Sequence, residues 1–338
     1  GDVNGDGHLD LVITGLDANS DRTATLYLGD GDGGLTRLGT GLTGVWRGSL
    51  SLGDVNGDGD LDLVITGENG VDPTATLYLG DGSGGFTDAQ AGLADVDYSS
   101  SSLGDVNGDG DLDLVITGRA NDGRTATLYL GNGDGGGGFT DAQAGLTGVR
   151  NGSSSLGDVN SDGDLDLVIT GVDANGDPTA TLYLGDGSGG FTDAQAGLAD
   201  VDYSSSSLGD VNGDGALDLV ITGKGTNDNG TATVYENLTL PPPTFTSTIP
   251  SRSVAAGGIF TATAATKSSS TTLSLSEGES IPNVTFTDNG DGTASFSFSP
   301  ETSQAGQDFD FTVTATNTEG VSTSFSFTLT VPATIAVL

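Results

Sequence analysis

Short apolar segments alternate with turns rich in Gly and Asp along most of the chain. Residues 112–117 (Leu-Asp-Leu-Val-Ile-Thr) place apolar side chains on both faces of an extended strand. Residues 96–103 precede this segment, residues 125–130 follow it, and a fourth short segment begins at Phe139. Gly and β-branched residues recur too densely for helical periodicity. The pattern therefore predicts four short antiparallel strands, the second of them buried on both faces.

This four-strand pattern recurs in five copies. Residues 53–67 read GDVNGDGDLDLVITG, and the first Asp of the five copies falls at intervals of 51 to 53 residues, at Asp2, Asp54, Asp105, Asp158 and Asp210. A four-stranded unit of about 50 residues is typical of a β-propeller blade, which stacks on other blades because it cannot bury both faces alone. We therefore expect an all-β chain in which residues 1–239 form propeller blades.

The first and last copies are incomplete. The chain starts on the acidic motif, so the first copy lacks its first strand, and the fifth copy stops after Glu236 without a fourth strand. We expect that upstream blades are missing from this sequence. Two alternatives remain open, namely strands supplied by a neighbouring subunit and an open stack of blades.

The composition changes after residue 239. Residues 240–243 (Leu-Pro-Pro-Pro) predict a stiff linker, and residues 293–299, 309–316 and 324–331 alternate polar and apolar side chains with a period of two. Residues 244–338 are therefore predicted to form a β-sandwich, and the stretch 289–320 resembles bacterial immunoglobulin-like or cadherin-like modules. Its Asn-Gly-Asp-Gly sequence at 289–292 predicts a hairpin turn. The apolar residues 332–338 could pair with an exposed edge strand of a neighbour.

Charge narrows the classes of partner. The chain has 47 acidic against 9 basic residues and a formal charge of −38, which disfavours nucleic acid and anionic membranes and favours cations. The absence of Cys excludes disulfides, thiolate metal sites and thiol catalysis. No segment has the length and hydropathy of a membrane helix. Because the sequence starts at Gly1 and contains no Met, we expect a processed or partial chain.

The spacing of the acids suggests a metal site. In the copy from Asp54 to Asp62, side-chain oxygens occupy loop positions 1, 3, 5 and 9, and Gly59 at position 6 permits a tight bend. Position 7 varies between copies. Such variation is expected if this residue contributes only its main-chain carbonyl to the metal. Oxygen ligands without His or Cys favour Ca²⁺ over transition metals, and a loop with about six oxygens favours it over Mg²⁺. The alternative is a set of acidic turns that bind no metal.

The residues that follow the loop distinguish between calcium-binding families. An EF-hand needs Glu at position 12, where this copy has Ile65 in an apolar strand, and dockerin modules continue into a helix. The whole motif resembles the FG-GAP repeat, also called the VCBS repeat, of integrin α-subunit propellers and bacterial surface proteins. That resemblance implies that each loop joins the first two strands of a blade and holds one Ca²⁺, five in all.

Carried over by position, the resemblance implies five ligands per copy, the residue at position 7 contributing its carbonyl. They are Asp2, Asn4, Asp6, His8 and Asp10; Asp54, Asn56, Asp58, Asp60 and Asp62; Asp105, Asn107, Asp109, Asp111 and Asp113; Asp158, Asn160, Asp162, Asp164 and Asp166; and Asp210, Asn212, Asp214, Ala216 and Asp218. The second Gly-Asp loops, such as residues 80–85, lack this spacing and predict hairpins.

No catalytic constellation is apparent. His8 is the single histidine and has no equivalent in the other copies, so it forms no nucleophile-base pair, and we expect no enzyme activity. Trp46 lies in the strand before the second copy, where other copies have Tyr98 and Tyr203, and is either a packing aromatic or a sugar-stacking residue. The sequence favours a calcium-stabilised, secreted structural or adhesion protein of the cell surface, whose partner is a protein or glycan and which assembles through the C-terminal domain into an oligomer or filament. The alternative is a carbohydrate-binding module.

Overall fold

The computed structural model describes residues 1–338 except 40, 71, 134, 228, 238–242, 268–270, 277–280, 319 and 334–338. The chain forms two compact units, Gly1–Val211 with Leu217–Glu236 and Asn237–Leu338 with Asn212–Ala216. In the described part, every element is a strand apart from a 3₁₀ turn at Thr302–Gln304, which confirms the all-β prediction. Most of the predicted linker (240–242) and of the C-terminal apolar segment (334–338) lies outside the described residues.

The third repeat shows the sheet that the sequence predicts. β8 (Asp97–Gly104), β9 (Asp113–Ala120), β10 (Gly123–Gly131) and β11 (Phe139–Asp141) form a four-stranded antiparallel sheet in the order β11-β10-β9-β8. The first six residues of β9 are all buried. The prediction of a second strand with two buried faces is therefore confirmed.

The other repeats follow the same plan. The first comprises β1 (Leu11–Leu16), β2 (Arg22–Gly29) and β3 (Leu35–Leu38); the second β4 (Trp46–Gly53), β5 (Asp62–Glu68), β6 (Pro73–Gly80) and β7 (Phe86–Asp88); the fourth β12 (Arg150–Gly157), β13 (Asp166–Val172), β14 (Pro178–Gly185) and β15 (Phe191–Asp193); and the fifth β16 (Val201–Gly209), β17 (Asp218–Gly225) and β18 (Gly230–Tyr235).

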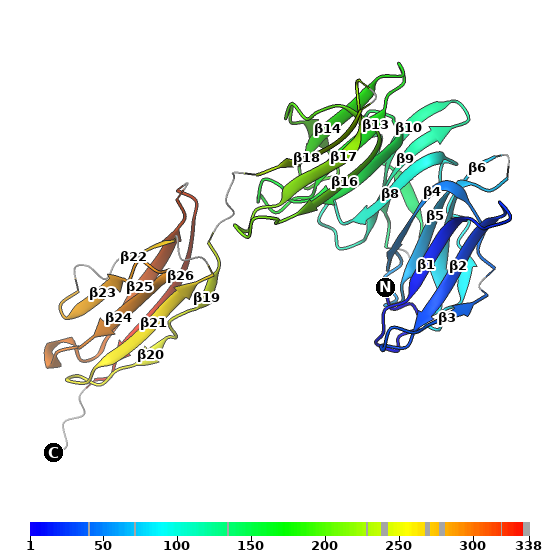
Figure 1. Cartoon of the computed structure of the whole chain (residues 1–338). Helices are drawn as coiled ribbons and strands as arrows, with labels where there is room; N and C mark the ends of the chain where they lie inside the picture. Colours follow the sequence, from blue (N-terminus) through cyan, green and yellow to red (C-terminus); the bar gives the residue numbers. More distant parts are fainter. Residues whose placement is uncertain are drawn as a thin grey trace. The chain divides into compact units, whose positions relative to one another are not determined.

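Consecutive sheets lie against one another in the blue-to-green part of Figure 1. Buried apolar side chains from neighbouring sheets fill the space between them. The core between the third and fourth sheets contains Val115 and Leu128 from one and Leu167 and Ile169 from the other. The first strands β4, β8, β12 and β16 lie next to one another. Among the described residues, no strand pairing joins the first sheet to the last, and the β-propeller stays a prediction.

A glycine before each acidic loop allows this close stacking. A Cβ on Gly104 would lie 2.8 Å from Leu165 Cδ1 and 3.0 Å from Leu156 Cδ1, both in the next repeat. Gly209 occupies the same position in the fifth repeat, and a Cβ there would have no atom within 4 Å. The glycine is therefore required only where another repeat follows.

The second unit consists of two sheets around one core. β19 (Phe245–Ser247), β21 (Phe260–Thr266), β24 (Thr293–Phe298) and β23 (Val284–Asp288) form one sheet in that order; β20 (Arg252–Ser253), β26 (Ser322–Val331), β25 (Gln307–Thr316) and β22 (Thr272–Ser276) form the other. The ring centroid of Phe296 on β24 lies 5.1 Å from that of Phe311 on β25 and 5.2 Å from that of Phe327 on β26. These aromatic side chains pack the two sheets face to face.

The Asn-Gly-Asp-Gly segment at 289–292 connects β23 and β24, which pair antiparallel. The Asn289 N–H donates to the Thr293 carbonyl over 2.9 Å, and Asp291 accepts hydrogen bonds from Thr293. The segment is thus the predicted hairpin turn.

No helix in the described part of the chain is long and apolar enough to cross a membrane.

Candidate metal loops and an aromatic groove

Each complete acidic loop joins the first and second strands of its repeat. In the third repeat, the loop leaves β8 after Gly104 and enters β9 at Asp113, the residue at loop position 9. The structure therefore places positions 1, 3, 5 and 9 in the one loop that connects these two strands. The nine-residue loop is defined here as the acidic loop.

The Asp at position 9 anchors the loop to the sheet. Asp113 is fully buried, and its two carboxylate oxygens accept hydrogen bonds from the Val106 N–H (2.8 Å) and from the Gly131 N–H at the end of β10 (2.9 Å). Asp10, Asp62 and Asp166 make the same two bonds in their repeats. This residue therefore has a structural role that does not require a metal.

The remaining acidic positions close the loop on itself. Asp105 at position 1 accepts from the N–H groups of Gly108 (2.7 Å) and Gly110 (2.9 Å). Asp109 at position 5 accepts from the Asp111 N–H (2.9 Å) and from the side-chain amide of Asn107 (2.7 Å). The fourth repeat has Ser161 in place of Gly at position 4, and its φ of 61° keeps the left-handed backbone.

Electrostatics make a cation favourable in these loops. Burial raises the pKa of Asp113, and the charges of Asp109 and Asp105 raise it further. Burial likewise raises the pKa of Asp62 and of Asp166. The three carboxylates of such a loop repel one another, and together they offer oxygen atoms that a hard cation prefers.

The oxygen atoms of the loop are of the type that binds Ca²⁺, but their present positions do not form a coordination shell. Carboxylate oxygens that each accept one N–H retain further lone pairs for a metal. Among the described residues, however, no three Asp, Glu, His or Cys side chains converge into a metal-binding cluster. A bound ion would draw the side chains at positions 1, 3 and 5 inward, and calcium stays a prediction.

Position 7 contacts the second loop of its repeat. A Cβ on Gly133 would lie 2.3 Å from the Asp111 carboxylate, and one on Gly31 would lie 2.5 Å from the imidazole of His8. The side chain at position 7 therefore packs against a glycine of the second loop, both where it is Asp and where it is His. In the second loops, an Asp side chain closes the turn by hydrogen bonds to the backbone. Asp81, for example, accepts hydrogen bonds from Ser83 and from the Gly85 N–H (2.8 Å).

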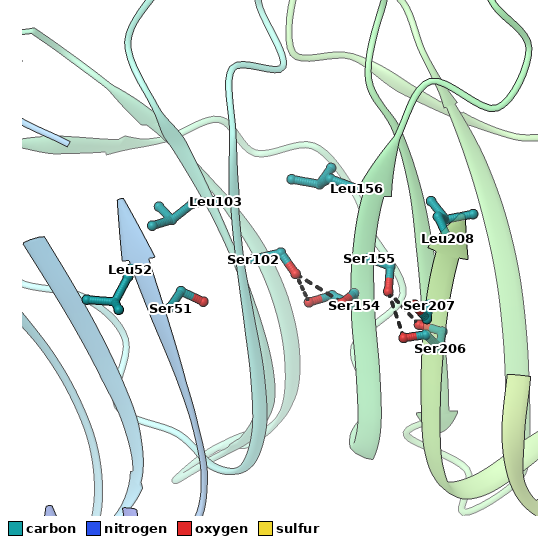
Figure 2. A pocket seen from close by; sticks show the side chains of 10 residues that line it. All are labelled: Ser51, Leu52, Ser102, Leu103, Ser154, Ser155, Leu156, Ser206, Ser207 and Leu208. Atoms are coloured by element: carbon teal, nitrogen blue, oxygen red, sulfur yellow. Dashed lines mark hydrogen bonds between the residues drawn. The ribbon is translucent and has the colours of Figure 1, made fainter. Parts of the chain in front are cut away.

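Serines connect neighbouring first strands. Figure 2 shows Ser102 pointing toward Ser154, with 2.8 Å between the hydroxyl oxygens, and Ser155 toward Ser206, also at 2.8 Å. Ser51 and Ser101 make the equivalent contact between β4 and β8. We call these residues the serine ladder. Apart from Ser101, these serines line a cavity of about 470 Å³ together with leucines on the same strands.

The opposite ends of the first strands contain a repeated bulge. Arg47, Tyr98, Asn151 and Tyr203 occupy equivalent positions, and each has a positive φ between 47° and 54°. Strand register corrects the sequence alignment of Trp46, because Trp46 pairs with Glu68 as Asp97 pairs with Arg119. The residue equivalent to Tyr98 and Tyr203 is therefore Arg47, and the predicted equivalence of Trp46 with these tyrosines was wrong by one residue.

These bulges line a second cavity, of about 490 Å³, which we call the bulge groove. Its walls include Trp46, Arg47, Tyr98, Asn151 and Tyr203. The Arg47 guanidinium lies 3.7 Å from the Trp46 ring centroid and 4.4 Å from that of Tyr98. Most of a first strand, roughly 20 Å of extended chain, separates the bulge groove from the acidic loop of the same repeat.

Sequence reasoning missed the cationic residues that lie close to Tyr98. The Arg119 and Arg150 guanidinium groups lie 4.9 Å and 5.9 Å from the Tyr98 ring centroid. A signal for the bulge residues was present in the repeat alignment, since the residue seven positions before the first Asp of the loop is aromatic, Arg or Asn in every repeat that contains it. Arg119 and Arg150 lie outside that column. The bulge residues can be aligned correctly only when the strand register is known, because the bulge shifts that register.

The FG-GAP-like repeat family matches residues 2–65, 54–116, 105–169 and 158–221, in four consecutive units. The chain belongs to the FG-GAP-like repeat family. The family resemblance predicted from the acidic motif is thus confirmed for the repeats.

The comparisons with curated proteins and with solved structures give weaker similarities. The search among curated proteins found no match. Among solved structures, titin domain M3 shares 22% identity over 27% of this chain and 96% of that one, with a TM-score of 0.23. Domains 4 and 5 of the S-layer protein SbsC share 15% over 48% and 89% (TM-score 0.23), and a Ca²⁺-stabilised, ice-binding adhesin of an Antarctic bacterium shares 14% over 92% and 81% (TM-score 0.18). At these TM-scores the similarities support no conclusion about function.

Proposed function

We propose that this FG-GAP-like repeat chain is a calcium-stabilised structural or adhesion protein of the cell exterior. The observation that carries the proposal is the buried Asp at position 9, which lies near two further carboxylates in the second and third repeats. A cation in each loop would offset the repulsion and would add its binding free energy to folding. Extracellular fluids contain millimolar calcium, which is enough to occupy sites of weak affinity.

Within each complete loop, the side chains at positions 1, 3, 5 and 9 and the carbonyl at position 7 would hold the ion. Calcium supplies charge neutralisation and cross-linking in this role. We expect no catalytic chemistry, because the chain lacks Cys and its single His8 is exposed.

Two architectural proposals accompany this function. The stacked four-stranded sheets support blades of a β-propeller. The strand orders β19-β21-β24-β23 and β20-β26-β25-β22 support an immunoglobulin-like sandwich. When β19 and β20 are counted as two parts of one first strand, the first, second, fifth and fourth strands share one sheet, as in the A, B, E and D strands of that fold. A propeller followed by such a sandwich suits an exported protein that assembles through its second unit.

Thermal unfolding tests the calcium proposal. We expect excess EGTA to lower the melting temperature by many degrees and restored Ca²⁺ to recover it, with Mg²⁺ far less effective. A single site at a hundredfold excess over its Kd contributes about 2.7 kcal/mol. An unchanged melting curve in EGTA would show that the acidic loops are only turns.

A carbohydrate-binding role is the second candidate. The bulge groove favours it, because exposed aromatic and polar side chains share one cavity there.

A further inference from the structure

Four apolar side chains of the first sheet and its loop are exposed at one end of the stack of repeats. We call them the head face; they are Leu9, Leu11, Ile13 and Leu35. In the second repeat, the equivalents of Leu11 and Ile13 are Leu63 and Ile65, which are at most 1% exposed because they pack on the first repeat. Within the described part of the chain, the head face therefore has the residues of a repeat interface without a repeat against it.

The last sheet shows the complementary exposure. Val211 and Val234 are 58% and 55% exposed. Their equivalents in the third repeat, Val106 and Leu128, are buried in the core shared with the fourth repeat. We call Gly209, Val211 and Val234 the tail face. The head face and the tail face thus correspond to the two sides of the interface that joins consecutive repeats.

One contact recurs wherever one repeat follows another. The Leu at loop position 8 lies against the glycine that precedes the acidic loop of the repeat before it, as Leu165 does at Gly104, where a Cβ would lie 2.8 Å from Leu165 Cδ1. Leu9 is the position-8 residue of the first repeat and is 79% exposed. A Cβ on Gly209 would meet no atom within 4 Å. The head face therefore presents the leucine of this contact, and the tail face presents the open glycine.

We propose that a second copy of this chain docks head to tail, with the head face of one copy against the tail face of the other. The contact repeats the interface between consecutive repeats, and it uses none of the predicted calcium ligands. The last sheet of the same chain does not cover the head face, because both faces are exposed and three repeats lie between them. Since the two faces differ, each pair of copies keeps one free face of each kind, and association continues into an open chain or closes into a ring.

Charges at the two ends favour this partner. Arg37 on β3 occupies the position at which β7, β11 and β15 each have Asp, and by strand alternation it lies on the same side as Leu35. Glu236 follows β18 at the position of Leu28 in the first repeat, and it is exposed. A base is thus added at the head and an acid at the tail, which favours contact between unlike ends. At about 0.15 M salt, the repulsion from the net charge of −38 is screened beyond about 8 Å.

Analytical ultracentrifugation of the full chain tests the proposal. The protein is studied at about 0.15 M NaCl and constant free Ca²⁺, at concentrations up to about 100 μM, which detects a Kd in the micromolar range. We expect species larger than the monomer, whose population rises with concentration. A monomer at every concentration would overturn the proposal, since it would mean that the faces stay free or that the chain closes on itself.

Complementary variants locate the interface. Ile13→Glu on the head face and Val234→Glu on the tail face should each weaken association by at least about ten-fold, as for loss of a buried apolar side chain. An equimolar mixture of the two retains one intact head and one intact tail, and should form 1:1 dimers and nothing larger. Ile259→Glu and Val321→Glu make the same changes at exposed positions of the second unit and should have no effect. A mixture that stays monomeric, or a head or tail variant that associates as the unmodified chain does, would contradict head-to-tail docking.

Gly209→Ala separates this docking from non-specific apolar association. The added methyl group would occupy the space that Leu9 of the second copy needs, so we expect at least about ten-fold weaker association although the surface becomes more apolar. Unchanged or tighter association would overturn the proposed contact. Circular dichroism and melting curves in Ca²⁺ establish that each variant is folded.

Discussion

At the scale of single residues, Asp113 has two roles that the sequence does not separate. It was predicted as a calcium ligand, and the structure shows a fully buried carboxylate that accepts two backbone N–H groups from different segments. Either orientation of an Asn side chain at this position would turn its NH₂ group toward one of those donors. The carboxylate therefore holds the loop to the end of β10 with or without a metal.

We expect Asp113→Asn to reduce the free energy of unfolding by about 1–3 kcal/mol even in excess EGTA, the cost of a buried unpaired donor. Asp111→Asn is the matched control, since the Asp111 carboxylate accepts no hydrogen bond from the described residues. Urea unfolding in EGTA measures both. If Asp113→Asn loses stability only in the presence of Ca²⁺, the residue acts solely through the metal.

Glu68 provides a residue-scale test of pH dependence. Its hydrogen bond with Arg22 from the first repeat, together with Arg47, lowers the pKa of Glu68. A carboxylate with a lowered pKa stabilises the fold above its unfolded pKa of about 4.3, and this contribution disappears as the pH falls through its folded pKa.

We therefore expect Glu68→Gln to cost about 1 kcal/mol of unfolding free energy at pH 7, the scale of a partly exposed ion pair. The difference from the unmodified protein should shrink as the pH falls through the folded pKa of Glu68 and should vanish below it. Denaturant titrations of both proteins at each pH measure this difference. A constant difference across the range would show that the ion pair is not its source.

At the scale of elements, the glycine at the end of each first strand determines how closely the next sheet can approach. Gly104 faces Leu156 and Leu165 of the next repeat, whereas Gly209 faces no atom within 4 Å. The motif is the same at both sites, and only the stacking differs.

We expect Gly104→Ala to destabilise the protein by about 1–3 kcal/mol through overpacking, and Gly209→Ala to change stability by no more than about 0.5 kcal/mol. Chemical denaturation followed by far-UV circular dichroism compares the two. Equal effects would indicate that the glycine serves the loop conformation and not the stacking.

At the scale of the whole molecule, the acidic loops belong to the repeats and Trp46 is the single tryptophan of the chain. Trp46 lies in β4, so its fluorescence reports on the repeats. The sandwich core instead contains clustered Phe side chains, and no complete acidic motif occurs in residues 244–338.

We expect EGTA to lower the midpoint of the Trp46 fluorescence transition and to leave a second calorimetric transition, that of the sandwich, unchanged. Scanning calorimetry and fluorescence on the full chain, with and without EGTA, provide the measurement. A parallel shift of both transitions would show that the two units unfold together.

The sequence alone determined the repeat, its four strands and the acidic loop. Each depends on local chemistry, because strand periodicity, turn-forming Gly and Asp residues, and side-chain spacing within nine residues act over short distances. The strands β8 to β11 and the 289–292 hairpin follow the predicted segments for this reason. Whether the loops bind calcium stays a prediction from the same local pattern.

Only the tertiary structure revealed the bulge groove and the second role of Asp113. The bulge shifts the register of each first strand, so Arg47 and not Trp46 is equivalent to Tyr98 and Tyr203. Arg119, Arg150 and Tyr98 are distant in sequence and meet because neighbouring sheets stack. Contacts of this kind depend on which strands become neighbours, and no pattern within one repeat contains that information.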